Sequence, residues 1–218
     1  LINRRFGGAF LHNFDLDSLL PTLQLVDGKT TAERVTKDIN ESTDGLLERT
    51  NFVRDIISRF RSEGFYTWMG LRYFLYEYNL DLQERSKTKR PKIFWPEFNE
   101  EIDDFITVEH IFPKQARDRY WATRFNGLTQ KQKATIRNSL GNLLPLSKPK
   151  NSSLSNSPFP AKVEGSRDAV VGYRYGCYAE NEVASVSEWT PAEISRRGLS
   201  LLKFMEERWR LDLGSDSE

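Results

Sequence analysis

The amino-acid sequence predicts an α+β fold in which helices dominate. Several long segments place apolar residues at helical spacing, whereas only two short segments, 106–111 and 140–146, have the pattern of strands. The 218 residues suit one large domain, or one domain with a helical extension. An apolar fraction of 38%, which includes 14 Phe, 8 Tyr and 5 Trp, is enough to bury a hydrophobic core.

The composition also excludes several classes of protein. No segment approaches the roughly 18 consecutive apolar residues that a membrane-spanning helix needs, and the first residues do not have the pattern of a signal peptide. Cys177 is the single cysteine, which excludes an internal disulfide and a cysteine zinc cage and fits a reducing cytoplasm. Because the chain begins with Leu1, we expect a piece of a longer protein. The net charge of +1 does not by itself indicate a nucleic-acid binder.

Three helices are expected in the N-terminal half. Thr31 is expected to cap the first, whose apolar positions include Val35 and Ile39. The second covers about 46–61, and its apolar face consists of Leu47, Phe52, Ile56, Ile57 and Phe60. The third covers 66–80, is dense in aromatic residues and is expected to be buried, because aromatic residues at helical spacing more often form core than stack on bases.

The middle of the chain alternates loops, helices and the two strands. Residues 85–100 are expected to form a loop, since two prolines interrupt any helix there. After the first strand, residues 115–137 have a helical pattern with a break at Gly127. The second strand is followed by 147–160, whose Ser, Asn and Pro content is typical of a turn followed by a short helix or an irregular loop.

The clearest helix of the sequence lies near the C-terminus, over 191–211. Thr190 has the position of its cap and Pro191 that of its first residue. Its buried stripe is expected to consist of Ile194, Leu201, Leu202, Met205 and Trp209. We therefore divide the chain into a helical N-terminal region or extension, 1–98, and a second region, 99–213, that contains both strands, the helical insertion 115–137 and this last helix.

The sequence has two histidines, so any histidine-based acid–base chemistry must use His12 or His110. His12 lies in a turn-rich aromatic stretch with no acidic residue beside it. His110 directly follows Glu109 at the end of the first expected strand. A histidine with a pKa near neutrality is suited to take a proton from water. An acidic residue followed by histidine is weak evidence alone, so the interpretation depends on the residues downstream.

Three sequence pieces downstream and around His110 carry a resemblance to a known family. They are VEHIFP, then LGNLLPLS with Asn142, then NSSLSNSPFPAK with Asn151 nine positions after Asn142. In this order they resemble the HNH endonuclease superfamily and, more narrowly, the C-terminal nuclease domain of GmrSD-type modification-dependent restriction enzymes. The segments YTWMGLRYFLYEY and EWTPAEISRRGLSLL are also similar to that family, so the resemblance extends over roughly residues 50–210.

The resemblance implies a ββα-metal unit surrounded by a helical bundle, which makes 99–213 a nuclease domain. It implies that His110 is the base that activates water and that Glu109 and Asn151 are metal ligands, with Asn156 as a possible substitute for Asn151. Asn142 is expected to hydrogen-bond across the turn that carries His110. Lys162 is a candidate phosphate contact, with a solvated lysine as the alternative.

The expected metal is Mg²⁺ or Mn²⁺, because Glu109 and the amide of Asn151 offer oxygen atoms and such cations retain several waters. Structural zinc is not expected without a cysteine cluster. Two features depart from the simplest HNH pattern. The separation between His110 and Asn142 is long and filled by a basic helical insertion, and the last ligand is Asn instead of His, which weakens the metal site.

The resemblance also implies partners and a setting. We expect a DNA endonuclease or nickase of bacterial antiviral defence that leaves 5′-phosphate and 3′-hydroxyl ends. A separate N-terminal domain, which hydrolyses NTP or senses a modification, would select the DNA. One alternative is a non-catalytic DNA-binding or assembly module on a degenerate HNH scaffold. Another is a purely helical interaction domain with an accidental match, which would lack paired strands beneath His110 and Asn151.

Overall fold

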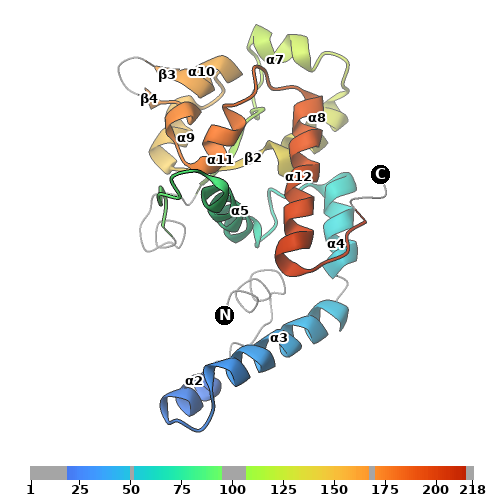
Figure 1. Ribbon diagram of the computed structural model, residues 1–218. Coiled ribbons are helices and arrows are strands. Elements are labelled where there is room, and N and C mark those ends of the chain that lie inside the picture. The colour runs from blue at the N-terminus through green and yellow to red at the C-terminus, as the bar shows by residue number, and fades with distance from the viewer. Residues whose placement is uncertain (1–18, 50–51, 95–106, 167–169, 215–218) are drawn as a thin grey trace.

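The computed structural model describes residues 19–49, 52–94, 107–166 and 170–214. These residues form a mainly helical structure with two small antiparallel sheets of two strands each (Figure 1). The expected dominance of helices in an α+β fold is therefore confirmed. His12 and the end of the expected loop 85–100 lie outside the described residues. None of the described helices is both long and apolar enough to cross a membrane.

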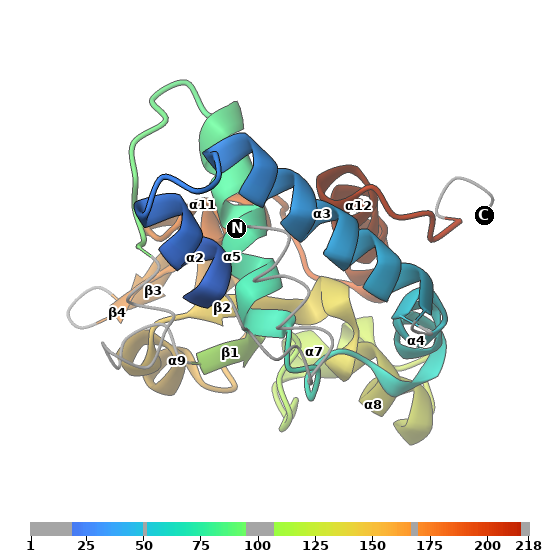
Figure 2. The same ribbon diagram turned by 90° about the horizontal axis from the view of Figure 1, so that it is seen from below.

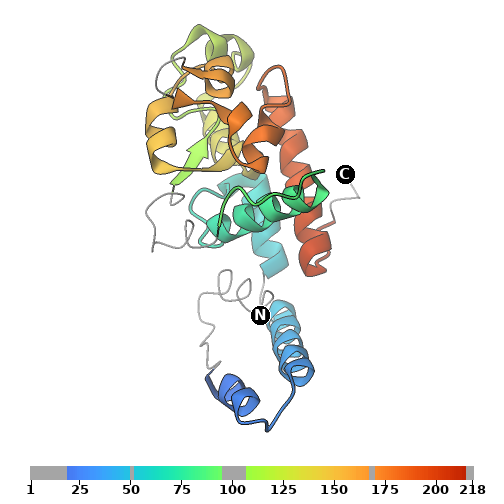
Figure 3. The same cartoon turned by 60° about the vertical axis from the view of Figure 1, so that its left-hand side comes forward.

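The first two described helices, α2 (Leu19–Val26) and α3 (Ala32–Arg49), form an arm that lies apart from the remaining described helices (Figures 1 and 3). The hydroxyl of Thr31 accepts a 3.2 Å hydrogen bond from the amide of Arg34, so Thr31 caps α3 as predicted. The helix predicted over 46–61 is wrong as one element. Its first residues belong to α3, and α4 (Phe52–Ser58) begins separately and ends in a π-helical turn, Arg59–Glu63.

The aromatic segment forms a buried helix, but this helix starts later than predicted. It is α5 (Leu71–Arg85), whereas 66–80 was expected. The residues before it form turns, in which the amide of Trp68 donates to the carbonyl of Phe65. Phe65 is 0% and Trp68 7% exposed, so both rings reach the core from a turn and not from a helical face. Figure 2 shows α5 passing over β2, which it contacts.

The two predicted strands pair with each other. β1 (Thr107–His110) and β2 (Leu143–Leu146) are antiparallel, with His110 opposite Leu143. Helix α9 (Lys148–Leu154) follows β2 directly and contacts β1. The paired strands make the purely helical alternative wrong.

The second strand begins later than predicted because a 3-10 turn, Leu140–Asn142, precedes it. This turn packs closely on the C-terminal helix. A Cβ on Gly141 would lie 1.9 Å from the carbonyl oxygen of Ile194, so a side chain cannot be accommodated there. The first residues of the expected strand therefore form a turn, and this turn packs the start of β2 against the last helix.

The insertion between the strands is helical with an interruption around Gly127, as predicted. It contains α7 (Arg119–Arg124) and α8 (Gln130–Asn138), and α8 begins with a capping box between Thr129 and Gln132. The segment after α9 contains elements that were not predicted. They are α10 (Phe159–Glu164), β3 (Gly165–Ser166), β4 (Val170–Val171), a 3-10 turn (Tyr173–Tyr175) and α11 (Tyr178–Val183).

The C-terminal helix α12 (Pro191–Trp209) is capped by Thr190, and all five residues of its expected stripe are buried. Two hydrophobic clusters lie on either side of β2. Leu143 belongs to a cluster with α4, α5 and α12, whereas Leu144 belongs to one with the insertion, α10 and α11. Because the first cluster joins residues on both sides of position 98, the domain division at that position stays a prediction.

Candidate functional site

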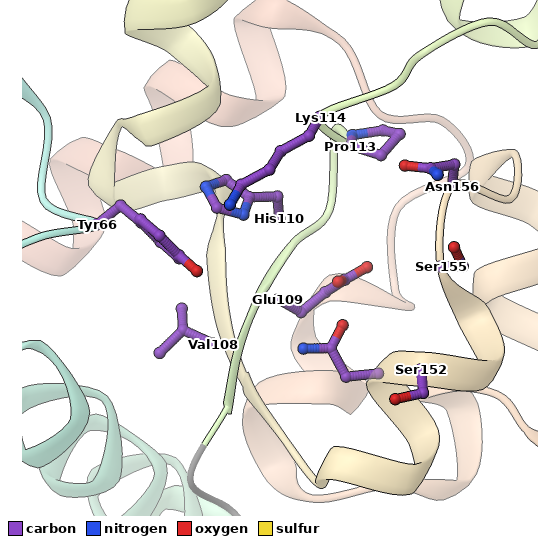
Figure 4. Close-up of a pocket in the computed structure, with 10 residues that line it drawn as sticks. Tyr66, Val108, Glu109, His110, Pro113, Lys114, Ser152, Ser155 and Asn156 are labelled. Carbon is purple, nitrogen blue, oxygen red and sulfur yellow. The ribbon is translucent and has the colours of Figure 1, made fainter.

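A cavity of about 300 Å³ opens beside the end of β1 (Figure 4). Glu109 and His110 line it from β1, Asn151 lines it from α9, and Tyr66 lines it from the turns before α5. The remaining lining residues are Val108, Pro113, Lys114, Ser152, Ser155 and Asn156. The structure thus brings together three of the five site residues predicted from the sequence.

His110 is almost completely buried, with 6% exposed. Its Nε2 lies 3.1 Å from Oδ1 of Asn138, and its ring packs on Tyr66 with centroids 4.2 Å apart. Burial is the main cause that lowers the pKa of His110, and the positive charges of Lys114 and Arg137 add to it, so that the pKa is about 4 although the hydrogen bond to Asn138 opposes the shift. The ring is therefore neutral at neutral pH and able to accept a proton.

Glu109 leaves β1 in the direction opposite to His110, toward α9 (Figure 4). The carboxylate is buried, and its Oε1 forms an ion pair with Lys162 and accepts a 3.2 Å hydrogen bond from the hydroxyl of Tyr173. Burial raises the pKa of Glu109 and lowers that of Lys162, and the attraction between the two charges opposes both shifts.

Lys162 has 0% of its side chain exposed and also donates to the backbone oxygen of His110, at 3.3 Å. The alternative of a solvated lysine is therefore wrong. Its ammonium group faces Glu109 and does not line the cavity, so a contact to phosphate stays a prediction without support from this geometry.

Asn142 is fully buried and does not line the cavity. Its Oδ1 accepts hydrogen bonds from the amide of Phe112, at 2.8 Å, and from the indole of Trp189, at 3.1 Å. Its Nδ2 donates to the carbonyls of Phe112, at 3.1 Å, and Arg137, at 2.9 Å. These contacts hold the turn that follows His110 against α8 and the segment before α12.

The residues at the site that were not singled out from the sequence include Tyr66, Lys114, Asn138 and Tyr173. Tyr66 was assigned to a core helix, yet 39% of it is exposed beside His110. Lys114 was one of many residues in a basic stretch. Asn138 and Tyr173 reach the site through contacts between segments distant in sequence, and no local pattern marks them.

Apart from the ring of His110, the side-chain atoms that line the cavity and could bind a cation are oxygens: the Glu109 carboxylate, two amides, two serine hydroxyls and the hydroxyl of Tyr66. Lys162 and Tyr173 both contact Oε1 of Glu109. The other carboxylate oxygen, Oε2, can therefore bind a cation. Within the described ranges, no three His, Cys, Asp or Glu side chains gather as a metal cluster. This donor set fits a cation such as Mg²⁺ or Mn²⁺ that keeps several waters. Asn151 and Asn156 both line the cavity, so the choice between them stays open.

A neutral histidine, a buried carboxylate and neighbouring amide oxygens around one cavity are groups with which hydrolases activate water. The sequence model of the C-terminal domain of GmrSD restriction endonucleases matches residues 52–204, which is more than half of the chain. The chain belongs to this family, as its sequence motifs predicted. Searches of curated proteins and of solved structures gave no match.

The buried pair of Lys162 and Glu109 provides a test of the site's geometry. The variant Lys162→Met is expected to lower the free energy of unfolding by about 3–5 kcal/mol, because it leaves a buried carboxylate without its partner. Urea denaturation measures the change. Adding Glu109→Gln should restore part of the loss, since the remaining group is then uncharged.

The exposed ion pair between Arg174 and Glu164 supplies the control. Arg174→Met is expected to leave the free energy of unfolding nearly unchanged, because both partners are exposed and the pair is screened by water. Equal effects of Lys162→Met and Arg174→Met would contradict the burial of the Lys162 ammonium group.

Proposed function

We propose that this domain is a metal-dependent DNA endonuclease of the HNH type, in which β1, β2 and α9 form the ββα unit. One observation carries the proposal: His110, Glu109 and Asn151, which come from two separate sequence pieces, line one cavity. Membership in a family of restriction endonuclease domains supports the same conclusion.

In this proposal, His110 removes a proton from the attacking water, and its neutral ring is ready to do so. Glu109 and the side-chain amide oxygen of Asn151 would hold a divalent cation, which would supply positive charge for the negative charge that develops on the phosphate. Lys162 and Tyr173 fix the orientation of the Glu109 carboxylate. Asn142 contributes to the site without touching substrate: its four hydrogen bonds fix the turn that follows His110.

Lys114 is better placed than Lys162 to bind the scissile phosphate. Its side chain is exposed, lines the cavity and lies with Nζ 4.6 Å from the ring centroid of Tyr66. Among the described residues that line the cavity, Lys114 is the one with a positive charge. An exposed ammonium group can approach a phosphodiester with little desolvation, whereas Lys162 would first have to leave Glu109.

The domain is proposed to be the effector of a cytoplasmic antiviral restriction system that nicks or cuts DNA. A nuclease unit of this kind contacts mainly the DNA backbone, so selection of the target requires another domain. The proposed partner is an N-terminal domain that hydrolyses NTP or senses a modification, in agreement with the family of C-terminal domains.

The second candidate is a DNA-binding or assembly module without catalysis. It is favoured by one observation: among the described residues, the cavity offers a single carboxylate, Glu109, for a cation. The two candidates differ in whether a divalent metal permits cleavage, so one assay separates them.

The central test is nicking of supercoiled plasmid with Mg²⁺ or Mn²⁺. His110→Ala is expected to reduce the rate roughly 10²–10⁴-fold, since it removes the proposed base. Asn151→Ala should require a higher metal concentration. Asn126→Ala, which changes an exposed asparagine outside the cavity, is the matched control and should retain the wild-type rate.

Nicked product should carry 5′-phosphate and 3′-hydroxyl ends. Nicking by His110→Ala at the wild-type rate would contradict the assignment of the base. DNA binding without cleavage under any divalent metal would instead establish the non-catalytic module.

The acid–base behaviour of His110 gives a separate prediction. In the free protein its NMR titration is expected to have a midpoint near 4, because burial disfavours the imidazolium. The neutral base form then persists as the pH falls through about 6.5, where a solvated histidine gains its proton, and is lost only as the pH falls through about 4. The acid limb of kcat/KM should follow this lower midpoint. A midpoint near 6.5 would show that the ring is solvated and that the described burial is wrong.

Removal of the proposed phosphate contact should weaken DNA binding. Lys114→Ala is expected to raise Kd for DNA and to reduce the slope of log Kd against log salt concentration by about 1, because one counterion fewer is released. Lys131→Ala, an exposed lysine of α8 outside the cavity, is the matched control. Fluorescence anisotropy at several salt concentrations gives both quantities, and equal effects of the two variants would refute a specific role for Lys114.

A further inference from the structure

The ring of His110 meets a side chain that the sequence motif does not include. Asn138, the last residue of α8, has its Oδ1 3.1 Å from Nε2 of His110. An amide oxygen accepts hydrogen bonds and has no proton to donate. The hydrogen in this contact therefore belongs to Nε2 of the imidazole.

Asn138 is itself held in place by the segment 64–66. Its carbonyl oxygen accepts a 2.7 Å hydrogen bond from the amide of Phe65. Gly64 approaches so closely that a Cβ there would lie 2.6 Å from Cβ of Asn138. Tyr66, the next residue of the segment, packs on the ring of His110. One segment thus fixes both the hydrogen-bond acceptor of the imidazole and one face of its ring.

We propose that Asn138 is a positioning residue that holds neutral His110 as the Nε2–H tautomer, so that the lone pair lies on Nδ1. A neutral imidazole has a hydrogen on one ring nitrogen and a lone pair on the other. The hydrogen-bond partner of one nitrogen determines which of the two carries the hydrogen. The tautomer follows from the contact with Asn138 alone. The role of this tautomer in catalysis, in which Nδ1 takes the proton from water, rests on the proposed function.

Nitrogen NMR of the histidine rings tests the tautomer directly. The chain has two histidines, so ¹⁵N-histidine labelling gives two ring systems, and His12→Gln assigns them. At neutral pH, His110 of the wild type is expected to show two well-separated nitrogen shifts, with the hydrogen on Nε2. Asn138→Leu, of similar size but without an acceptor, should give the averaged shifts of exchanging tautomers.

Two further variants sharpen the test. Asn138→Asp retains an oxygen acceptor and is expected to keep the Nε2–H form. Asn126→Ala is the control and should leave the His110 shifts unchanged. A wild-type ring with its hydrogen on Nδ1, or with averaged shifts, overturns the proposal. So does an Asn138→Leu variant in which His110 stays in the Nε2–H form.

Kinetics then separate positioning from folding. In the plasmid assay, Asn138→Leu is expected to lower kcat about 10- to 100-fold with little change in KM, as for other groups that orient a reactive side chain. Asn138→Asp should restore part of kcat, and full activity of Asn138→Leu would overturn the role in positioning. Because the NMR result does not require cleavage, a wild type that cuts no DNA would refute the proposed function while the tautomer assignment stands.

Discussion

The buried amide of Asn142 holds together the segments that carry the site. It uses both hydrogens and its oxygen in four contacts, to the turn after β1, to the end of α8 and to Trp189. A buried amide that lost any of these partners would carry a desolvation cost of about 1–3 kcal/mol for each unmet group. The position of His110 relative to α8, and therefore to Asn138, depends on this one side chain being fully satisfied.

A second constraint is the buried charge of Glu109. A carboxylate with 5% exposure is strongly desolvated, and without a compensating charge it would take up a proton. Lys162 supplies that charge from α10 and Tyr173 adds a hydrogen bond, both to the same oxygen. The sequence interpretation gave Lys162 as a candidate phosphate contact, with a solvated lysine as the alternative. The structure excludes the solvated lysine, because the buried ammonium group of Lys162 is paired with Glu109. The sequence names a lysine at this position but does not show whether it is buried.

The parts of the fold that follow from local signals were predictable. Thr190 and Pro191 mark the start of α12, its stripe marks the buried face, and the residues around Glu109 and Leu143 mark the paired strands. The predictions failed where tertiary contacts override local pattern. The late start of α5 depends on rings that reach the core from turns, and the 3-10 turn before β2 depends on contact with α12. Asn138 and Tyr66 meet His110 only after three segments have packed, so no spacing in the sequence reveals them.

The charge around His110 explains why a net charge of +1 is a poor guide to this site. Lys114 and Arg137 add to the effect of burial on the pKa of the ring, and the same positive field attracts phosphate. In the free protein the ring is a weak base, with a pKa of about 4. If a phosphodiester binds beside Lys114, its negative charge offsets that of the lysine and favours the imidazolium. In the proposed mechanism, the strength of His110 as a base is then coupled to the presence of substrate. Burial and local positive charge keep the ring unprotonated until an anion arrives to stabilise its protonated form.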